Sequence, residues 1–164
     1  MNNKKVMFLT QAAMIAALYV VLTFIANAFG LASGAIQVRL SEALAVLPFF
    51  TPAAIPGLYV GCMLANFLTG GCVLDIFVGS LATLIGALAA YVLRKWKWLV
   101  PLPNIIANAL IVPFVLIHGY GMADAWWYLF LTVGAGEIIS CGILGMGLLL
   151  VMRNYSTQLF RTAD

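Results

Sequence analysis

Charged residues lie far apart along this chain. Uncharged and mostly apolar runs cover residues 6–38, 43–74, 76–93 and 98–123. Each run is close to, or longer than, the roughly 18 residues that a helix needs to cross the hydrocarbon core of a bilayer. The runs lack the alternation of apolar and polar residues typical of barrel strands, and backbone groups in lipid must be hydrogen-bonded within their own segment. The pattern therefore predicts an all-α membrane protein.

Composition leads to the same class. Of the 164 residues, 65% are hydrophobic and 8% are charged, whereas ordinary soluble domains carry roughly a quarter charged residues. We expect a single domain, residues 1–164, embedded in a lipid bilayer. The net charge of +3 comes without a basic stripe interleaved with aromatic residues, so a nucleic-acid partner is not predicted. The three cysteines form no CxxC pair and have no His cluster beside them, so we predict no metal site and no cofactor.

Apolar periodicity and turn residues place six transmembrane helices in one polytopic bundle. Their predicted ranges are roughly 6–29, 42–50, 52–69, 73–93, 101–118 and 125–152. The run 43–70 contains Pro48, Pro52 and Pro56, which would break one continuous helix, so it could be one kinked span or two. Lysine and arginine mark cytoplasmic loops. Only the count of six puts both termini and the basic loop at Arg94 on one side, so we expect a multi-pass protein of the cell membrane with cytoplasmic termini.

Four ionisable side chains fall at membrane depth, where each is a functional candidate because its burial is costly. Arg39 and Glu42 are three residues apart and could form a local ion pair. Asp75 could cap the helix that it begins. Glu137 lies about 12 residues into the last helix, near the bilayer midplane, where a protonated glutamate could simply join helices.

Further polar and aromatic residues share helix faces with these charges. Tyr59 and Asn66 lie on one face of the third predicted helix, and Asn104 and Asn108 on one face of the fifth. The alternative for the asparagines is interhelical hydrogen bonding, and the alternative for Trp126 and Trp127 is an interfacial belt. The predicted substrate-binding residues are Arg39, Glu42, Tyr59, Asn66, Asp75, Asn108, Trp126, Trp127 and Glu137.

Small residues predict two close helix contacts. Gly57 and Gly61 form a GxxxG pattern that indicates packing inside the bundle. A doubled AxxxA face in the first helix allows another helix to approach, from the bundle or from a partner. Its members are Ala12, Ala13, Ala16 and Ala17.

Several enzyme classes lack their motifs here. The chain has no GxxxxGK[ST] phosphate loop, no HExxH and a single His with no nucleophile arrangement beside it. An ATPase, a metalloprotease or a triad hydrolase is therefore not supported. The remaining interpretation is a small helical bundle that binds a solute and is not an enzyme.

Three segments resemble the QueT family. They are QVRLSEAL at 37–44, PAAIPGLYVG at 52–61 and DIFVGSLATL at 75–84. The resemblance implies the substrate-binding S component of an energy-coupling-factor (ECF) transporter, which captures a queuosine precursor, a 7-deazaguanine such as queuine, from outside. It also implies a transmembrane coupling subunit and two cytoplasmic ATPase subunits as partners, with the four alanines as the docking face.

A deazaguanine fits the candidate residues chemically. Its donor edge can be read by a carboxylate, for which we prefer Glu137, and its amino substituent is cationic near neutral pH, so carboxylates suit both ends.

A competing interpretation is a stand-alone secondary transporter of a small cation that uses Glu137 as a proton-coupled carboxylate. A third is a structural membrane subunit in which the polar residues only join helices.

We predict that Lys4, Arg94, Lys95 and the C-terminus are cytoplasmic, while the loop 30–41 is external, because six spans collect the basic residues on one side. Labelling of single cysteines introduced into the loops of intact cells measures this. A cysteine at residue 96 that reacts from outside would contradict the six-span topology.

Overall fold

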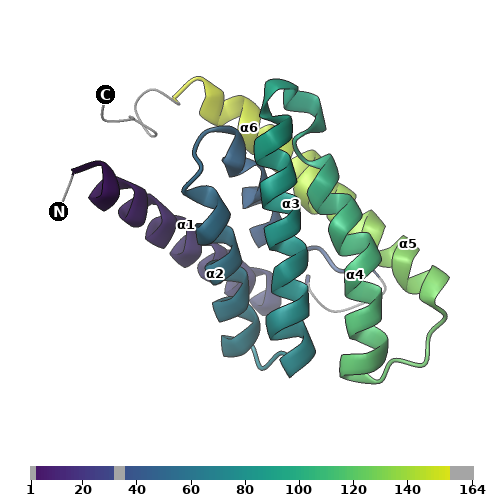
Figure 1. The fold of residues 1–164 in the computed structure, drawn as a ribbon. Coiled ribbons are helices and arrows are strands. Elements are labelled where there is room, and N and C mark those ends of the chain that lie inside the picture. Colours follow the sequence, from purple (N-terminus) through teal and green to yellow (C-terminus); the bar gives the residue numbers. More distant parts are fainter. Residues whose placement is uncertain (1–2, 32–35, 156–164) are drawn as a thin grey trace.

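The computed structural model describes residues 3–31 and 36–155, and every regular element in them is helical (Figure 1). Three uninterrupted α-helices are α1 (Asn3–Ala28), α2 (Ala54–Leu68) and α4 (Leu102–Tyr120). A 3-10 helix, η1 (Leu40–Phe49), lies between α1 and α2, and a π-helical turn, η2 (Asp75–Gly79), leads into α3 (Ser80–Val92). Two short 3-10 turns, η3 (Leu93–Lys95) and η4 (Lys97–Leu99), connect α3 to α4. The last helix combines α5 (Trp126–Glu137), the π-helical η5 (Ile138–Gly145) and α6 (Met146–Arg153).

All six predicted segments are helical, with ends within a few residues of the predicted ones. Among the described residues, four helices are long and apolar enough to cross a membrane: Asn3–Ala28, Asp75–Lys95, Lys97–Tyr120 and Trp126–Arg153. The other two, η1 and α2, are shorter apolar helices. The helical bundle is therefore confirmed, whereas the count of six membrane spans stays a prediction.

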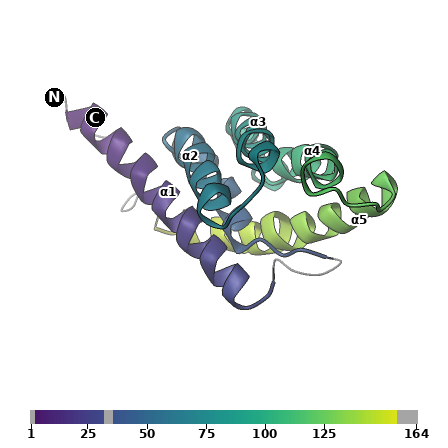
Figure 2. The ribbon, with the colours of Figure 1, turned by 90° about the horizontal axis from the view of Figure 1, so that it is seen from below.

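The short η1 lies at the centre of the bundle. It contacts α1, α2, α3, η5 and α6, and its residues from Leu44 to Pro48 are buried. Seen from below, α2, α3 and α4 lie in a row. The last helix, from α5 to α6, runs along one side of this row (Figure 2). This arrangement carries Glu42, at the start of η1, into the interior.

Helices α1 and α2 are in close contact through small residues, as the GxxxG pattern predicts. A Cβ atom on Gly57 would lie 2.8 Å from the carbonyl oxygen of Ala12, and one on Gly61 would lie 2.9 Å from the Cα of Ala16. The expected docking face is thereby divided. Ala12 and Ala16 are buried against α2, because their side of α1 faces the bundle, whereas Ala13 and Ala17 are exposed.

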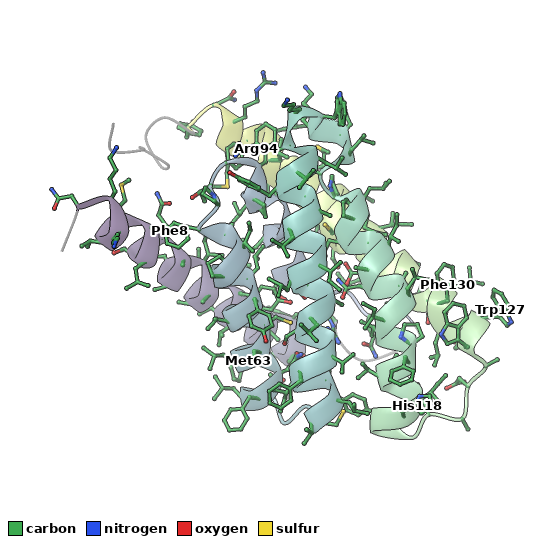
Figure 3. The ribbon with its side chains drawn as sticks, viewed as in Figure 1. Phe8, Met63, Arg94, His118, Trp127 and Phe130 are labelled. Atoms are coloured by element: carbon green, nitrogen blue, oxygen red, sulfur yellow. The ribbon has the colours of Figure 1, made fainter. Side chains whose placement is uncertain are left out.

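The two ends of the bundle differ in charge. Four basic residues and three aromatic residues line one hollow at the end where α3 is connected to α4: Arg94, Lys95, Lys97 and Arg153 with Phe49, Trp96 and Trp98. The label of Arg94 in the upper part of Figure 3 marks this end. The connections from α2 to η2 and from α4 to α5 lie at the opposite end, which is the lower end in Figure 1.

We predict that Gly57→Leu lowers the thermal unfolding temperature of the purified protein in detergent. The added side chain meets the backbone of α1, and overpacking of this kind costs about 1 to 3 kcal/mol. Ala13→Leu is the matched control, since it adds bulk to the exposed side of α1. Equal unfolding temperatures for the two variants would contradict the α1–α2 contact.

Candidate functional site

A cavity of about 330 Å³ opens at the end of the bundle away from Arg94. Its walls come from the C-terminal half of α1, the segment 37–41, the C-terminal end of α2, the start of η2 and the end of α4. The polar side chains in these walls are Tyr19, Thr23, Asn27, Gln37, Arg39, Ser41, Asn66, Thr69, Asp75 and Tyr120. Polar groups from helices far apart in the sequence therefore converge on one space, which is of the size that small-molecule sites have.

Asp75 is the carboxylate in this wall, and its side chain is 5% exposed. One oxygen accepts a hydrogen bond of 2.8 Å from the Tyr120 hydroxyl, and the other lies 3.5 Å from the Asn66 amide nitrogen. Asn66 also donates to the Asp75 carbonyl at 3.0 Å. A Cβ atom on Gly79 would lie 2.3 Å from the carboxylate, so a side chain at this position would displace Asp75. Asp75 therefore points into the bundle toward other helices, instead of capping its own.

Arg39 lies in the same wall, in the connection between α1 and η1. Its backbone N–H donates to the Ser140 hydroxyl at 3.0 Å. Burial alone would lower the pKa of Arg39, but the charge of Asp75, helped by Tyr19 and Glu42, raises it. Within the described part of the chain, no ion pair joins Arg39 to Glu42, so the local pair considered from the sequence is not formed. The cavity wall thus holds a guanidinium cation and a carboxylate.

Behind the cavity lies a network of buried polar side chains. Glu42 is fully buried and accepts hydrogen bonds from the Tyr19 hydroxyl and, at 2.8 Å, from the Asn104 amide. The same Asn104 nitrogen lies 3.4 Å from a carboxylate oxygen of Glu137. One asparagine therefore joins two carboxylates that come from η1 and α5. Because Tyr19 also lines the cavity, it connects the network to the cavity wall.

The core of the network is not saturated with hydrogen bonds. Asn108, one turn from Asn104, is 2% exposed, and its amide nitrogen has no hydrogen-bond partner among the described residues. The same holds for the carbonyl oxygen of Asn104 and the hydroxyl of Ser80. Buried polar groups are usually hydrogen-bonded, so Asn104 and Asn108 each keep an unused hydrogen-bonding atom near the two carboxylates.

The structure brings together some predicted site residues and not others. Arg39, Asn66 and Asp75 line the cavity, while Glu42, Asn108 and Glu137 are buried behind or beyond its walls. The three predicted aromatic residues, Tyr59, Trp126 and Trp127, do not line it. Trp126 stacks on Phe130, and Trp127 is 72% exposed at the outer edge of α5 (Figure 3).

The aromatic residues of the cavity are Tyr19 and Tyr120, which the sequence reasoning did not single out. A signal for Tyr19 was present, because it follows Ala12, Ile15 and Ala16 at helical spacing on the buried face of α1. Tyr120 stands between Gly119 and Gly121, and only its position in the turn is visible from the sequence.

Comparison with known proteins gives one family and one curated relative. A family described as QueT transporter matches residues 9–154. The protein named "Queuosine precursor transporter QueT" from Lactococcus lactis subsp. cremoris (strain MG1363) is 39% identical over 85 residues. That match spans 52% of this chain and 50% of the relative, so about half of each chain is compared. No solved structure matches the chain.

Proposed function

The chain belongs to the QueT transporter family, and from this premise we propose that it binds a queuosine precursor, a 7-deazaguanine such as queuine, for uptake across the cell membrane. The observation that carries the proposal is that Asp75 and Arg39 both line the wall of one cavity. The name of the Lactococcus relative supports the substrate class.

A carboxylate and a guanidinium in one cavity wall suit the edge of a guanine-like base. That edge presents two N–H donors beside a carbonyl acceptor, and enzymes that take up a single base read it through hydrogen bonds. A carboxylate accepts from both donors, and a guanidinium donates to the carbonyl oxygen. In our proposal Asp75 and Arg39 take these two roles. Asp75 thereby replaces Glu137 as reader of the base edge, because Glu137 does not line the cavity.

Tyr120, which is 47% exposed and lines the cavity, provides aromatic surface for the flat base, and the buried Tyr19 closes the wall beside it. Stacking of a base on an aromatic side chain contributes roughly 1 to 3 kcal/mol in other proteins. Both tyrosine hydroxyls already donate hydrogen bonds to carboxylates. Tyr19 donates to Glu42, and Tyr120 donates to Asp75. The rings are thus restrained before a ligand arrives, which lowers the entropic cost of binding.

We further propose that the protein is the S component of an ECF importer. The chain carries no phosphate loop, so ATP would be hydrolysed by two cytoplasmic ATPase subunits, joined to this protein through a transmembrane coupling subunit. Six membrane passes with cytoplasmic termini would place the cavity outside and the Arg94 end inside. Ala13 and Ala17 are then the exposed part of the docking face, since α2 covers Ala12 and Ala16.

We predict that Asp75→Asn weakens queuine binding by more than tenfold in titration calorimetry. Loss of a buried charged hydrogen-bond partner costs about 2 to 5 kcal/mol. Arg39→Gln should also weaken queuine binding. Glu137→Gln should weaken it less, because Glu137 acts on the site only through Asn104 and Glu42. Trp127→Ala is the control and should leave affinity unchanged. Unchanged affinity in Asp75→Asn would remove Asp75 from the site.

A second prediction separates the importer from a stand-alone transporter. Vesicles that hold the purified protein alone should not accumulate queuine under a proton gradient, whereas vesicles with the coupling and ATPase subunits should do so when ATP is supplied. Ala13→Leu combined with Ala17→Leu should reduce ATP-driven uptake and leave queuine affinity intact, because bulky residues prevent close helix approach. Uptake driven by protons alone would favour the secondary transporter.

A further inference from the structure

The hollow at the end of the bundle that Arg94 marks in Figure 3 is not used by the proposed function. Its volume is about 430 Å³. Of the seven described residues that line it, four are basic, three are aromatic and none is acidic. We propose that this basic hollow binds the headgroup of an anionic phospholipid from the membrane around the bundle.

The basic hollow lies where two apolar helices are joined. The segments Asp75–Lys95 and Lys97–Tyr120 are each long and apolar enough to cross a bilayer, and the turns η3 and η4 connect α3 to α4. Trp96 and Trp98 are 61% and 63% exposed, and tryptophan is enriched at the boundary between hydrocarbon and water. We therefore expect the connection at the level of the lipid headgroups, whichever side of the membrane it faces.

The backbone of the two turns is held in place by hydrogen bonds and by the core. The Trp96 N–H donates to the Leu93 carbonyl at 2.9 Å, and the Leu99 N–H donates to the Trp96 carbonyl at 2.8 Å. Val100 follows η4 and is fully buried in an apolar cluster, against which Phe49 of the basic hollow packs. The connection is thus anchored to the bundle, so its basic residues form a site before a ligand binds.

Two of the basic side chains lie over aromatic rings. The Arg94 guanidinium is 4.1 Å from the centre of the Tyr91 ring, and the Lys97 ammonium is 5.0 Å from the centre of the Trp98 ring. Such contacts stabilise a cation without neutralising its charge. A guanidinium together with ammonium groups is a donor set that suits phosphate oxygens, and basic pockets beside membrane helices bind anionic headgroups in other proteins.

An apolar groove beside the same turns favours a lipid over a free phosphate. Its volume is about 440 Å³, and the eight described residues that line it are all apolar. It begins at Leu93, the chain neighbour of Arg94, and at Leu102, the first residue of α4. It extends to Ile85 and Ile111, near the middle of α3 and of α4. This is the course that an acyl chain takes below its headgroup, so we expect one chain of the bound lipid in the groove.

Native mass spectrometry of the purified protein in detergent measures this binding. Given equal amounts of phosphatidylglycerol and phosphatidylcholine with the same acyl chains, the wild type should retain phosphatidylglycerol preferentially, since only that headgroup has a net charge. Arg94→Gln combined with Lys95→Gln should reduce the preference more than tenfold, because one basic side chain near a membrane surface contributes about fivefold. Both side chains are exposed, so the unfolding temperature without lipid should not change.

The matched control is Lys4→Gln combined with Lys5→Gln, which removes the same charge from two exposed neighbours that line a different hollow. This control should keep the preference. Equal losses in the two double variants would indicate diffuse attraction to positive charge and would overturn the site. Equal retention of both lipids by the wild type would overturn it as well.

Glycerol phosphate distinguishes a lipid from a free phosphate, because it carries the anionic group without acyl chains. An excess of it should leave phosphatidylglycerol bound. If glycerol phosphate at the same concentration as the lipid displaces it, the basic hollow is a site for soluble phosphates and the lipid proposal is wrong.

Discussion

A carboxylate inside an apolar bundle is stable only where other groups replace the water that it has lost, and Glu42 is such a carboxylate. Tyr19 and Asn104 supply the hydrogen bonds, which ties α1 and α4 to the central helix η1. Asn104 extends the connection to Glu137 at the end of α5. Four elements of the bundle are thus positioned by one buried group, and the cavity wall at Tyr19 is part of the same arrangement.

Small residues let the helices come close enough for these hydrogen bonds. In lipid the hydrophobic effect does not drive helices together, so close packing and interhelical hydrogen bonds decide their association. A Cβ atom on Gly86 of α3 would lie 2.7 Å from the Cα of Asn104. Gly79, Thr83, Gly86 and Ala90 follow one another at helical spacing along η2 and α3, and all four are buried. Gly79 leaves space for Asp75 and Gly86 for Asn104, so both glycines serve the polar interior directly.

The candidate site could be predicted in part because intramembrane charges are rare and costly. That argument found Arg39 and Asp75, both of which line the cavity. It could not rank the carboxylates, since depth along a helix indicates burial but not the side toward which a group points. Glu137 is buried as expected, yet its neighbour is Asn104 and not the cavity. Trp126 and Trp127 begin α5 and do not line the cavity, whose aromatic residues are Tyr19 and Tyr120.

By itself the sequence determined the class of the protein, the six helical segments and the close contact of Gly57 and Gly61 with another helix. These features depend on local composition and spacing, which hydropathy and residue size express directly. Only the tertiary structure decided that η1 is central, that α2 covers Ala12 and Ala16 while Ala13 and Ala17 stay exposed, and that Arg39 lines the same cavity as Asp75. Such choices depend on the rotation and order of the helices around one another, because a polar side chain in a bundle takes whichever partner the neighbouring helix presents.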